Sequence, residues 1–340
     1  MNSRTTPRII VDDNIPFIKG RLEPFAEVTY TDQFGFTPAL VADADALVIR
    51  TRTRCDETLL KGSKVRLIAT ATIGMDQFDL QWCRKAGIEC RNSPGCNAPG
   101  VAQYVWSALL RSGFDPKRHT LGVVGHGNVG SIVADWGRRL GAEVIVNDPP
   151  KAADGSLEYP HTPLDTLLRQ ADAVTLHTPL LRDGDHPTFH LIGERELALM
   201  KPRAIVVNAA RGPVADNQAL LRAVTNQKIQ AIIDTWEGEP DLCRELLDNV
   251  KIGTFHIAGY SLEGKQRATR MVLEAIGERF GFSPDTSGLA PAWQTPATVE
   301  ADKILSSYNP FDDTAPLKAD PGAFDTLRAN YRFRSEPKFS

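Results

Sequence analysis

A glycine-rich turn, Gly125-His-Gly127-Asn-Val-Gly130, constrains the fold of this chain more than any other segment. A β-branched run, Thr120-Leu-Gly-Val-Val, leads directly into the turn, and an amphipathic run that contains Ile132 and Leu140 follows it. A glycine turn between a strand and a helix is a phosphate-binding corner of a parallel α/β sheet, because free N–H groups at the helix start attract an anion. We therefore expect a doubly wound α/β domain around this turn.

The end of the next predicted strand indicates which dinucleotide the turn binds. That strand, Glu143–Asn147, is followed by Asp148, whose carboxylate can accept hydrogen bonds from ribose hydroxyls and would repel a 2′-phosphate. The sequence therefore predicts NAD, although Lys151 could accommodate the extra phosphate of NADP. A glycine turn that has lost its cofactor is the alternative. The cofactor contacts expected within the turn are Gly125, Gly127, Asn128, Val129 and Gly130.

Short apolar runs alternate with mixed segments along most of the chain, which is typical of parallel sheets. The strands predicted before the turn are Arg8–Val11, Ala46–Arg50, Arg66–Ala69 and Ile88–Arg91. The strands predicted after Asp148 are Ala173–Leu176, Ala204–Asn208 and Ile229–Asp234. The longer helices predicted are Val101–Arg111, Leu164–Gln170, Asn217–Thr225 and Leu262–Phe280. The pattern predicts two Rossmann-like or flavodoxin-like parallel-sheet domains.

The last predicted helix is long enough to return the chain to the first domain. We therefore expect a discontinuous substrate-binding domain, 1–98 with 260–281, and an NAD-binding Rossmann domain, 99–259. The remaining segment, 282–340, holds seven prolines and differs in character from the rest. It is predicted to be a short appended C-terminal module.

Composition excludes several classes of function. A formal net charge of −3 gives no general attraction to nucleic acid or to anionic membrane. No apolar stretch approaches the roughly 18 residues that a membrane helix needs, and the N-terminal segment lacks the apolar run of a secretory signal. Five cysteines without a CxxC pair predict neither a disulfide framework nor a metal site. A cytoplasmic protein is expected.

Arg211 follows a predicted buried strand, Ala204–Asn208. Ligands of open α/β sheets bind at the carboxyl ends of strands, and an arginine there can hold a substrate carboxylate with two hydrogen bonds. A salt-bridged loop arginine is the alternative for this residue by itself. Asp234, at the end of its own strand, is placed to reach the nicotinamide carboxamide.

His256 lies between small and apolar residues, in Gly253-Thr-Phe-His-Ile-Ala-Gly259. An imidazole can take a hydroxyl proton near neutral pH as a hydride leaves, although a histidine in this setting can also be a core residue. Two nearby acids, Glu237 and Glu239, are candidates to hold the imidazole and to favour its protonated form. With Arg211, the set predicts hydride transfer between a 2-hydroxy acid and NAD.

These segments resemble the D-2-hydroxyacid dehydrogenase family. The resemblance is carried by the glycine turn with Asp148, Asn208-Ala-Ala-Arg-Gly212, Asp234–Pro240 and His256–Gly259. It implies that Arg211, Glu239 and His256 carry catalysis, and it favours Glu239 over Glu237 because the catalytic glutamate of the family stands before the proline. The NAD contacts that it implies are Asp148, Thr178, Ala209, Ala210, Arg211, Asp234 and Gly259.

Finer motifs resemble the branch of this family that oxidises 4-phospho-D-erythronate in vitamin B6 biosynthesis. They include Pro94-Gly-Cys-Asn-Ala98, Asn147-Asp-Pro-Pro150 and Ala258-Gly-Tyr-Ser-Leu-Glu-Gly-Lys265. The resemblance implies substrate contacts at Thr51, Thr72 and Tyr260. We also expect Arg50 to meet the 4-phosphate, since a guanidinium matches phosphate geometry, although arginines at a strand end can simply face water.

The chain departs from the family pattern at several positions. Phe255 stands before the histidine where the family usually has proline, and Gln103 replaces a common glutamate. The segment 282–340 is shorter than the module through which this branch pairs, and a homodimer is expected. Another D-2-hydroxy acid, such as 3-phosphoglycerate, remains the nearest alternative substrate. A non-catalytic NAD-sensing protein is the alternative from a different class.

Overall fold

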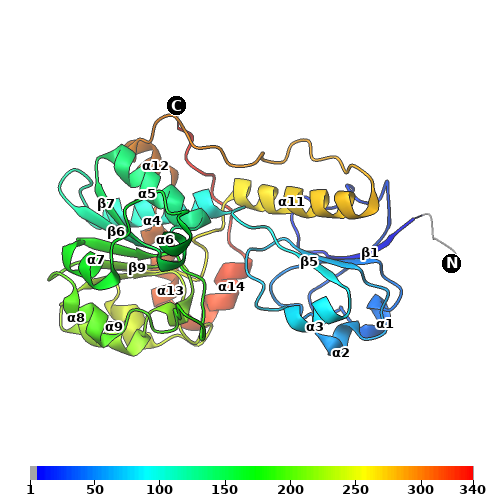
Figure 1. Cartoon of the computed structure of the whole chain (residues 1–340), viewed down its shortest axis with the longest axis horizontal. Coiled ribbons are helices and arrows are strands. Elements are labelled where there is room, and N and C mark those ends of the chain that lie inside the picture. The colour runs from blue at the N-terminus through cyan, green and yellow to red at the C-terminus, as the bar shows by residue number, and fades with distance from the viewer. Residues whose placement is uncertain (1–5, 340) are drawn as a thin grey trace. The chain divides into compact units, whose positions relative to one another are not determined.

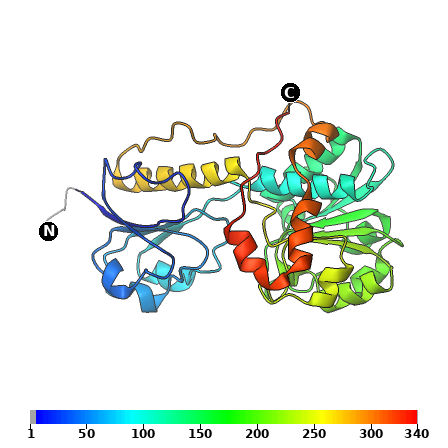
Figure 2. The same ribbon diagram turned by 180° about the vertical axis from the view of Figure 1, so that it is seen from behind.

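The computed structural model describes residues 6–339, in two compact units. Unit 1 is the chain up to Asn97 together with Leu262–Trp293, and unit 2 is Ala98–Ser261 together with the chain from Gln294 onward. Each unit contains a parallel sheet with helices on both faces (Figures 1 and 2). The predicted α/β class is thus confirmed. The first residues of the N-terminal segment, for which no secretory signal is expected, lie outside the described part.

Unit 1 is built on a five-stranded sheet in the order β2-β1-β3-β4-β5. Its strands are β1 (Arg8–Asp12), β2 (Glu27–Thr31), β3 (Ala46–Ile49), β4 (Leu67–Thr70) and β5 (Glu89–Arg91). Its helices are α1 (Pro38–Val41), α2 (Glu57–Leu60), α3 (Leu80–Lys85) and α11 (Leu262–Phe280). The first three helices lie on one side of the sheet and α11 on the other (Figure 1). Strands β3 and β4 are buried throughout, and apolar except for Thr70, because both faces are covered.

Unit 2 is built on a six-stranded sheet in the order β11-β10-β9-β8-β6-β7. Its strands are β6 (Thr120–Val124), β7 (Glu143–Asn147), β8 (Ala173–Leu176), β9 (Ile205–Asn208), β10 (Gln230–Ile233) and β11 (Ile252–Gly253). The helices before His256 are α4 (Ala98–Arg111), α5 (Asn128–Leu140), α6 (Pro149–Asp154), α7 (Leu164–Gln170), α8 (Glu194–Leu199), α9 (Asn217–Thr225) and α10 (Arg244–Asn249). Helices α4 and α5 lie on one side of the sheet, and α8 and α9 on the other (Figure 1).

The strand order of unit 2 creates a switch point beside the glycine turn. The chain passes from β6 to β7 on one side, and then to β8 on the opposite side of β6. Ligands of such sheets bind at this point, beyond the carboxyl ends of the strands. All neighbouring strand pairs are parallel, so the loops that follow the strands meet at one edge.

The C-terminal segment from Gln294 onward belongs to unit 2, whereas 282–293 belongs to unit 1. It forms α12 (Ala301–Ser307), α13 (Pro310–Ala319) and α14 (Phe324–Ala329). Leu317 and Phe324 are buried in the main apolar core of the unit, together with residues of the central sheet. Its expected role as a dimerisation-type module stays a prediction. No helix in the described part of the chain is long and apolar enough to span a bilayer.

Candidate active site

The glycine turn leaves no room for side chains at two of its positions. Gly125 has φ +88°, and a Cβ there would lie 2.8 Å from the backbone carbon of His177. A Cβ at Gly130 would lie 1.9 Å from the carbonyl oxygen of Gly125. These contacts show why the turn, the loop after β8 and the first turn of α5 can pack together only with glycine at both positions.

The third glycine borders open space instead. A Cβ at Gly127, the residue before α5, would meet no heavy atom within 4 Å. The N-terminus of α5 has no side-chain cap, so its backbone N–H groups remain for an anion. Thr178, in the loop after β8, has a buried hydroxyl without a hydrogen-bond partner among the described residues. These features fit the pyrophosphate of NAD.

Asp148 connects the turn to the loop after β7. Its Oδ2 accepts the backbone N–H of His126 at 2.7 Å, and its Oδ1 accepts that of Lys151 at 3.1 Å. The carboxylate is therefore fixed beside the glycine turn and retains lone pairs for ribose hydroxyls. No role was predicted for His126, which is buried with its ring edge to face with that of Tyr159. Burial lowers the pKa of His126 and favours the neutral ring.

Arg211 follows β9 in a turn that is held by the side chain of Asn208. The Asn208 amide donates to the carbonyl oxygens of Arg211 and Gly212, at 3.0 and 3.2 Å, and its Oδ1 accepts from the backbone N–H of Ala210. A Cβ at Gly212 would lie 2.0 Å from the carbonyl oxygen of Trp236. The turn 209–212, which contains Ala209 and Arg211, therefore packs backbone to backbone against the loop that carries Glu239.

His256 and Glu239 form the predicted pair. The Nδ1 of His256 lies 2.5 Å from Oε1 of Glu239, and Oε2 of the same carboxylate accepts the backbone N–H of Trp236 at 3.1 Å. Burial alone would raise the pKa of Glu239, but the hydrogen bond and charge of His256 lower it below its usual value. The carboxylate is therefore ionised, so Nδ1 carries a proton and Nε2 is left to accept one.

Asp234 fixes the segment that carries the histidine. Its buried carboxylate accepts the Thr254 hydroxyl at 2.7 Å and the backbone N–H groups of Ile257 and Ala258 at 2.8 and 2.9 Å. Its carbonyl oxygen accepts the N–H of His256, whose backbone has φ +59°. The structure thus gives Asp234 an anchoring role that the sequence did not reveal, while its predicted contact with the cofactor stays a prediction.

Arg334 holds the same segment from the C-terminal side, and no sequence motif pointed to it. Its buried guanidinium donates to the carbonyl oxygens of Ile257, Ala258 and Gly100, and its Nε–H donates to Oε1 of Gln103 at 2.9 Å. The amide of Gln103 in turn donates to Ser307 and Ser335. At position 103, glutamine accepts from the buried arginine, as a glutamate could, and also donates two hydrogen bonds that an ionised glutamate could not.

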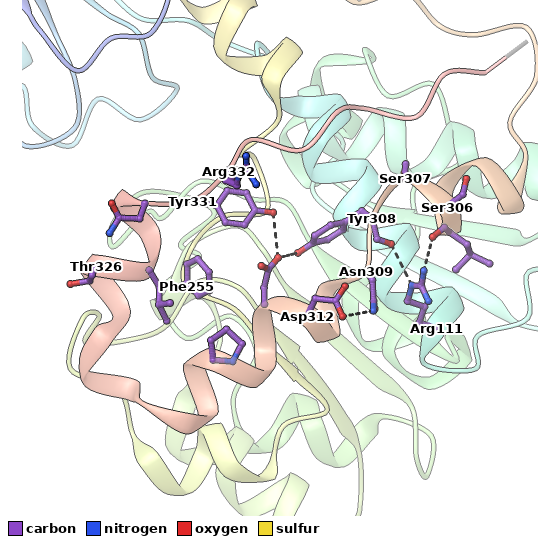
Figure 3. A pocket seen from close by; sticks show the side chains of 15 residues that line it. Arg111, Phe255, Ser306, Ser307, Tyr308, Asn309, Asp312, Thr326, Tyr331 and Arg332 are labelled. Atoms are coloured by element: carbon purple, nitrogen blue, oxygen red, sulfur yellow. Dashed lines mark hydrogen bonds between the residues drawn. The ribbon is translucent and has the colours of Figure 1, made fainter.

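Phe255 is packed away from the solvent. It is 2% exposed, and its ring meets that of Tyr331 edge to face at 5.9 Å. It lines a cavity of about 680 Å³ together with residues of the C-terminal segment (Figure 3). The hydroxyls of Tyr308 and Tyr331 both donate to Asp313 there, at 2.7 and 3.3 Å. The aromatic ring thus packs the histidine segment against Tyr331 of the C-terminal segment.

The predicted substrate residues of unit 1 follow two neighbouring strands. Arg50 and Thr51 come after β3, and Thr72 comes after β4. The Thr72 hydroxyl lies 2.8 Å from that of Thr70, and Thr51 is exposed. Asp12 ends the adjacent β1 and was not predicted; its Oδ2 is buried without a partner among the described residues. Tyr260, in unit 2, is half-buried beside Tyr331.

Comparison with known proteins identifies the family. Residues 97–258 match the D-isomer specific 2-hydroxyacid dehydrogenase family, NAD binding domain. An erythronate-4-phosphate dehydrogenase of Bacteroides thetaiotaomicron is 44% identical over 341 residues, which cover 97% of each chain. One of Shigella dysenteriae is 42% identical over 97% of this chain and 92% of its own. This chain belongs to the D-isomer specific 2-hydroxyacid dehydrogenases. It is an NAD-dependent dehydrogenase, as the glycine turn with Asp148 predicts.

Solved structures of D-2-hydroxyacid dehydrogenases share the fold. The D-lactate dehydrogenase of Aquifex aeolicus, complexed with NAD and lactic acid, aligns with a TM-score of 0.66 and 25% identity over 81% of this chain and 96% of its own. The holo form of D-mandelate dehydrogenase from Rhodotorula graminis aligns with a TM-score of 0.70 and 24% identity over 85% of this chain and 100% of its own. At 24% identity, the match to the D-mandelate dehydrogenase shows a shared fold only.

Proposed function

We propose that this dehydrogenase oxidises 4-phospho-D-erythronate to (3R)-3-hydroxy-2-oxo-4-phosphooxybutanoate, a step in pyridoxal 5′-phosphate (vitamin B6) synthesis. One observation carries the reaction: Arg211, Glu239 and His256 follow the adjacent strands β9, β10 and β11, at the sheet edge that also bears the glycine turn. The curated relatives, which are named for erythronate 4-phosphate, support the choice of substrate.

In this proposal the protein positions the acid and moves one proton. Arg211 binds the substrate carboxylate with two hydrogen bonds and so orients C2. Nε2 of His256 takes the proton of the 2-hydroxyl, while ionised Glu239 holds Nδ1–H and stabilises the ring as it becomes positively charged. The C2 hydrogen leaves as a hydride, and NAD supplies the acceptor for it when bound.

We assign the 4-phosphate to Arg50, and further substrate contacts to Thr51, Thr72 and Tyr260. Arginine and hydroxyl groups at the carboxyl ends of β3 and β4 suit a phosphorylated ligand. NAD contacts are assigned to the glycine turn, and to Asp148, Thr178, Ala209, Ala210, Arg211, Asp234 and Gly259.

We also propose a homodimer that works in the cytoplasm. Five free cysteines suit a reducing compartment. Pairing is assigned to the C-terminal segment, where Phe311 and Phe333 each keep 37% of their surface exposed. Sedimentation velocity tests the pairing, and a monomer at micromolar concentration would contradict it.

The substrate is tested by following NADH formation with 4-phospho-D-erythronate, 3-phosphoglycerate and D-lactate in parallel. We expect the highest kcat/KM with 4-phospho-D-erythronate. A higher value with 3-phosphoglycerate would point to the alternative substrate, and tight NAD binding without turnover of any acid would point to an NAD sensor.

The role of the base is tested with His256→Ala. We expect this change to lower kcat by about 10³-fold or more, because proton transfer and the pairing with Glu239 are both lost. NAD binding, measured by titration calorimetry, should stay within twofold of the wild-type value. Loss of NAD binding would instead make the histidine structural.

A further inference from the structure

The loop after β10 carries two acids that point to different partners. Glu237 and Glu239 flank Gly238, whose φ of +84° turns the chain sharply between them. Glu239 contacts His256, whereas Oε1 of Glu237 lies 2.8 Å from Nε2 of His190. Glu237, which the sequence offered as an alternative partner for His256, therefore contacts His190 instead. The structure leaves Glu239 alone as the partner of His256 among the acids of this loop.

The second oxygen of Glu237 has its own contact. Oε2 accepts the backbone N–H of Asn217, the first residue of α9, at 3.4 Å. Glu237 thus joins its loop both to His190 and to the start of a helix. The side chains of Glu237 and His190 are each about one-third exposed, at 32% and 34%. Such a pair contributes little to the free energy of unfolding. Its role is therefore to position the loops that it joins.

His190 is itself held tightly by the segment that follows Arg211. Its backbone N–H donates to the carbonyl oxygen of Pro213 at 2.7 Å, and Ile192 N–H donates to Val214 at 3.1 Å. The backbone of His190 has φ +51°, which is unusual for a residue with a side chain and requires support from its surroundings. The imidazole is thereby presented to Glu237 from a fixed backbone.

We propose that the His190–Glu237 contact positions the loop that carries Glu239, and we call this contact the clasp. It connects the turn that carries Arg211, through Pro213, to the loop that carries Glu239. It therefore fixes the distance between the group that binds the substrate carboxylate and the group that orients the base. A displacement of about 1 Å at such a site can cost about 10²-fold in rate, even when folding is unaffected. His190 and Glu237 act through Glu239 and touch no reacting atom.

The donor atoms of His190, Asp216 and Glu237 also lie within 4.8 Å of one another, a spacing that a metal ion could occupy. The clasp accounts for this cluster without an ion. Asp216 caps α9 by accepting the N–H groups of Gln218 and Ala219 at 2.8 and 3.1 Å, so its position is set by the helix. Addition of EDTA should therefore leave kcat unchanged, and a loss that Zn²⁺ or Mn²⁺ restores would replace the clasp by a metal site.

The clasp is tested with His190→Ala, Glu237→Ala and the double variant, in the full-length enzyme. We expect each single change to lower kcat by about 10- to 100-fold and the double variant to be no slower than the worse single one, because both residues serve one contact. Glu237→Gln, which keeps an oxygen for His190, should recover most of the rate. His186→Ala, at an exposed histidine of the same loop, is the matched control and should behave as wild type.

Two readouts separate positioning from a structural defect. Thermal midpoints should stay within about 3 °C of wild type, because the pair is partly exposed. The acid limb of the pH profile of kcat should move to lower pH, as expected when Glu239 no longer holds His256 closely. Rates within twofold of wild type would overturn the clasp, as would a lower rate with an unmoved acid limb and no recovery in Glu237→Gln.

This inference rests on the proposed roles of Arg211, Glu239 and His256. The clasp and the proposed substrate can nevertheless fail separately. The variants are compared with wild type on whichever D-2-hydroxy acid the wild-type enzyme oxidises fastest. If the wild-type enzyme is inactive on 4-phospho-D-erythronate alone, the proposed substrate is refuted. The ratio of variant to wild-type rate can then still be measured on another acid. Inactivity on every acid tried would overturn both.

Discussion

At the scale of single residues, the charge of Glu239 sets the pH range in which the base works. The pKa of Glu239 is lowered, so its charge is present at neutral pH and is lost only as pH falls through that lowered value. Glu239→Gln keeps a hydrogen-bond acceptor for His256 but removes the charge that favours the protonated ring. Without that charge the positively charged ring is less stable, and we expect the acid limb of kcat/KM to move to lower pH. Steady-state rates across pH measure the limb, and an unmoved limb would contradict the pairing.

Gly127, in the glycine turn, allows cofactor binding to be tested separately from proton transfer. Gly127→Ala adds a methyl group in open space, and the backbone of Gly127 is extended, so the protein should fold normally. The methyl group occupies the approach of the pyrophosphate, and we expect the NAD dissociation constant to rise at least about tenfold, roughly 1.4 kcal/mol.

The matched control for Gly127→Ala is Gly130→Ala. The new Cβ at position 130 would meet a backbone oxygen at 1.9 Å, so this change should lower the thermal midpoint as well as NAD affinity. Calorimetric titration and thermal unfolding distinguish the two variants. Normal NAD affinity in Gly127→Ala would show that the cofactor does not approach this glycine.

The sequence revealed those residues whose signal is local. Arg211, Glu239 and His256 each follow a strand and lie in a short motif, so their places at the sheet edge could be predicted. Arg334 could not, because its acceptors at Gly100, Gln103 and Ile257 lie far away in sequence. His190 was missed for the same reason: its partner, Glu237, belongs to a different loop.

At the scale of elements, the buried strands were predicted within one or two residues, because continuous apolar runs mark them. β2 was missed: this edge strand mixes Glu27 and threonines with few apolar residues. β11 has only two residues, too few for any pattern. α4 begins three residues earlier than predicted, at Ala98, because Pro99 and Gly100 resemble a turn although proline suits a first helical turn.

The C-terminal stretch around Arg334 should stabilise the histidine segment. Arg334→Met removes the donors to three buried carbonyl oxygens and to Gln103, and leaves those acceptors unsatisfied. We expect a loss of about 3 kcal/mol in the free energy of unfolding, with kcat reduced because His256 precedes two of these carbonyls. Arg332→Met, at an exposed arginine nearby, is the control and should change stability by less than about 0.5 kcal/mol. Urea unfolding followed by tryptophan fluorescence measures both, and equal stabilities would deny Arg334 this role.

At the scale of the molecule, the C-terminal segment from Gln294 onward contributes to the NAD-binding unit itself. Its prolines made it look separate in the sequence, yet Pro310 begins α13 and Pro316 lies within that helix. Leu317 and Phe324 are buried in the same core as strands β8 to β10. A local proline count cannot reveal such packing, because the contacts join segments far apart in the chain.

This packing predicts the result of removing the segment. Burial of Leu317 and Phe324 contributes roughly 2–3 kcal/mol each, and the Arg334 contacts add to this, so the loss is comparable to the total stability of a domain, about 5–15 kcal/mol. We expect a chain that ends at Trp293 to lose NAD binding and the cooperative unfolding of unit 2. If the segment serves only to pair two copies, the shortened chain will instead be a folded monomer that binds NAD. Calorimetric titration with NAD and sedimentation velocity on the same sample decide between the two.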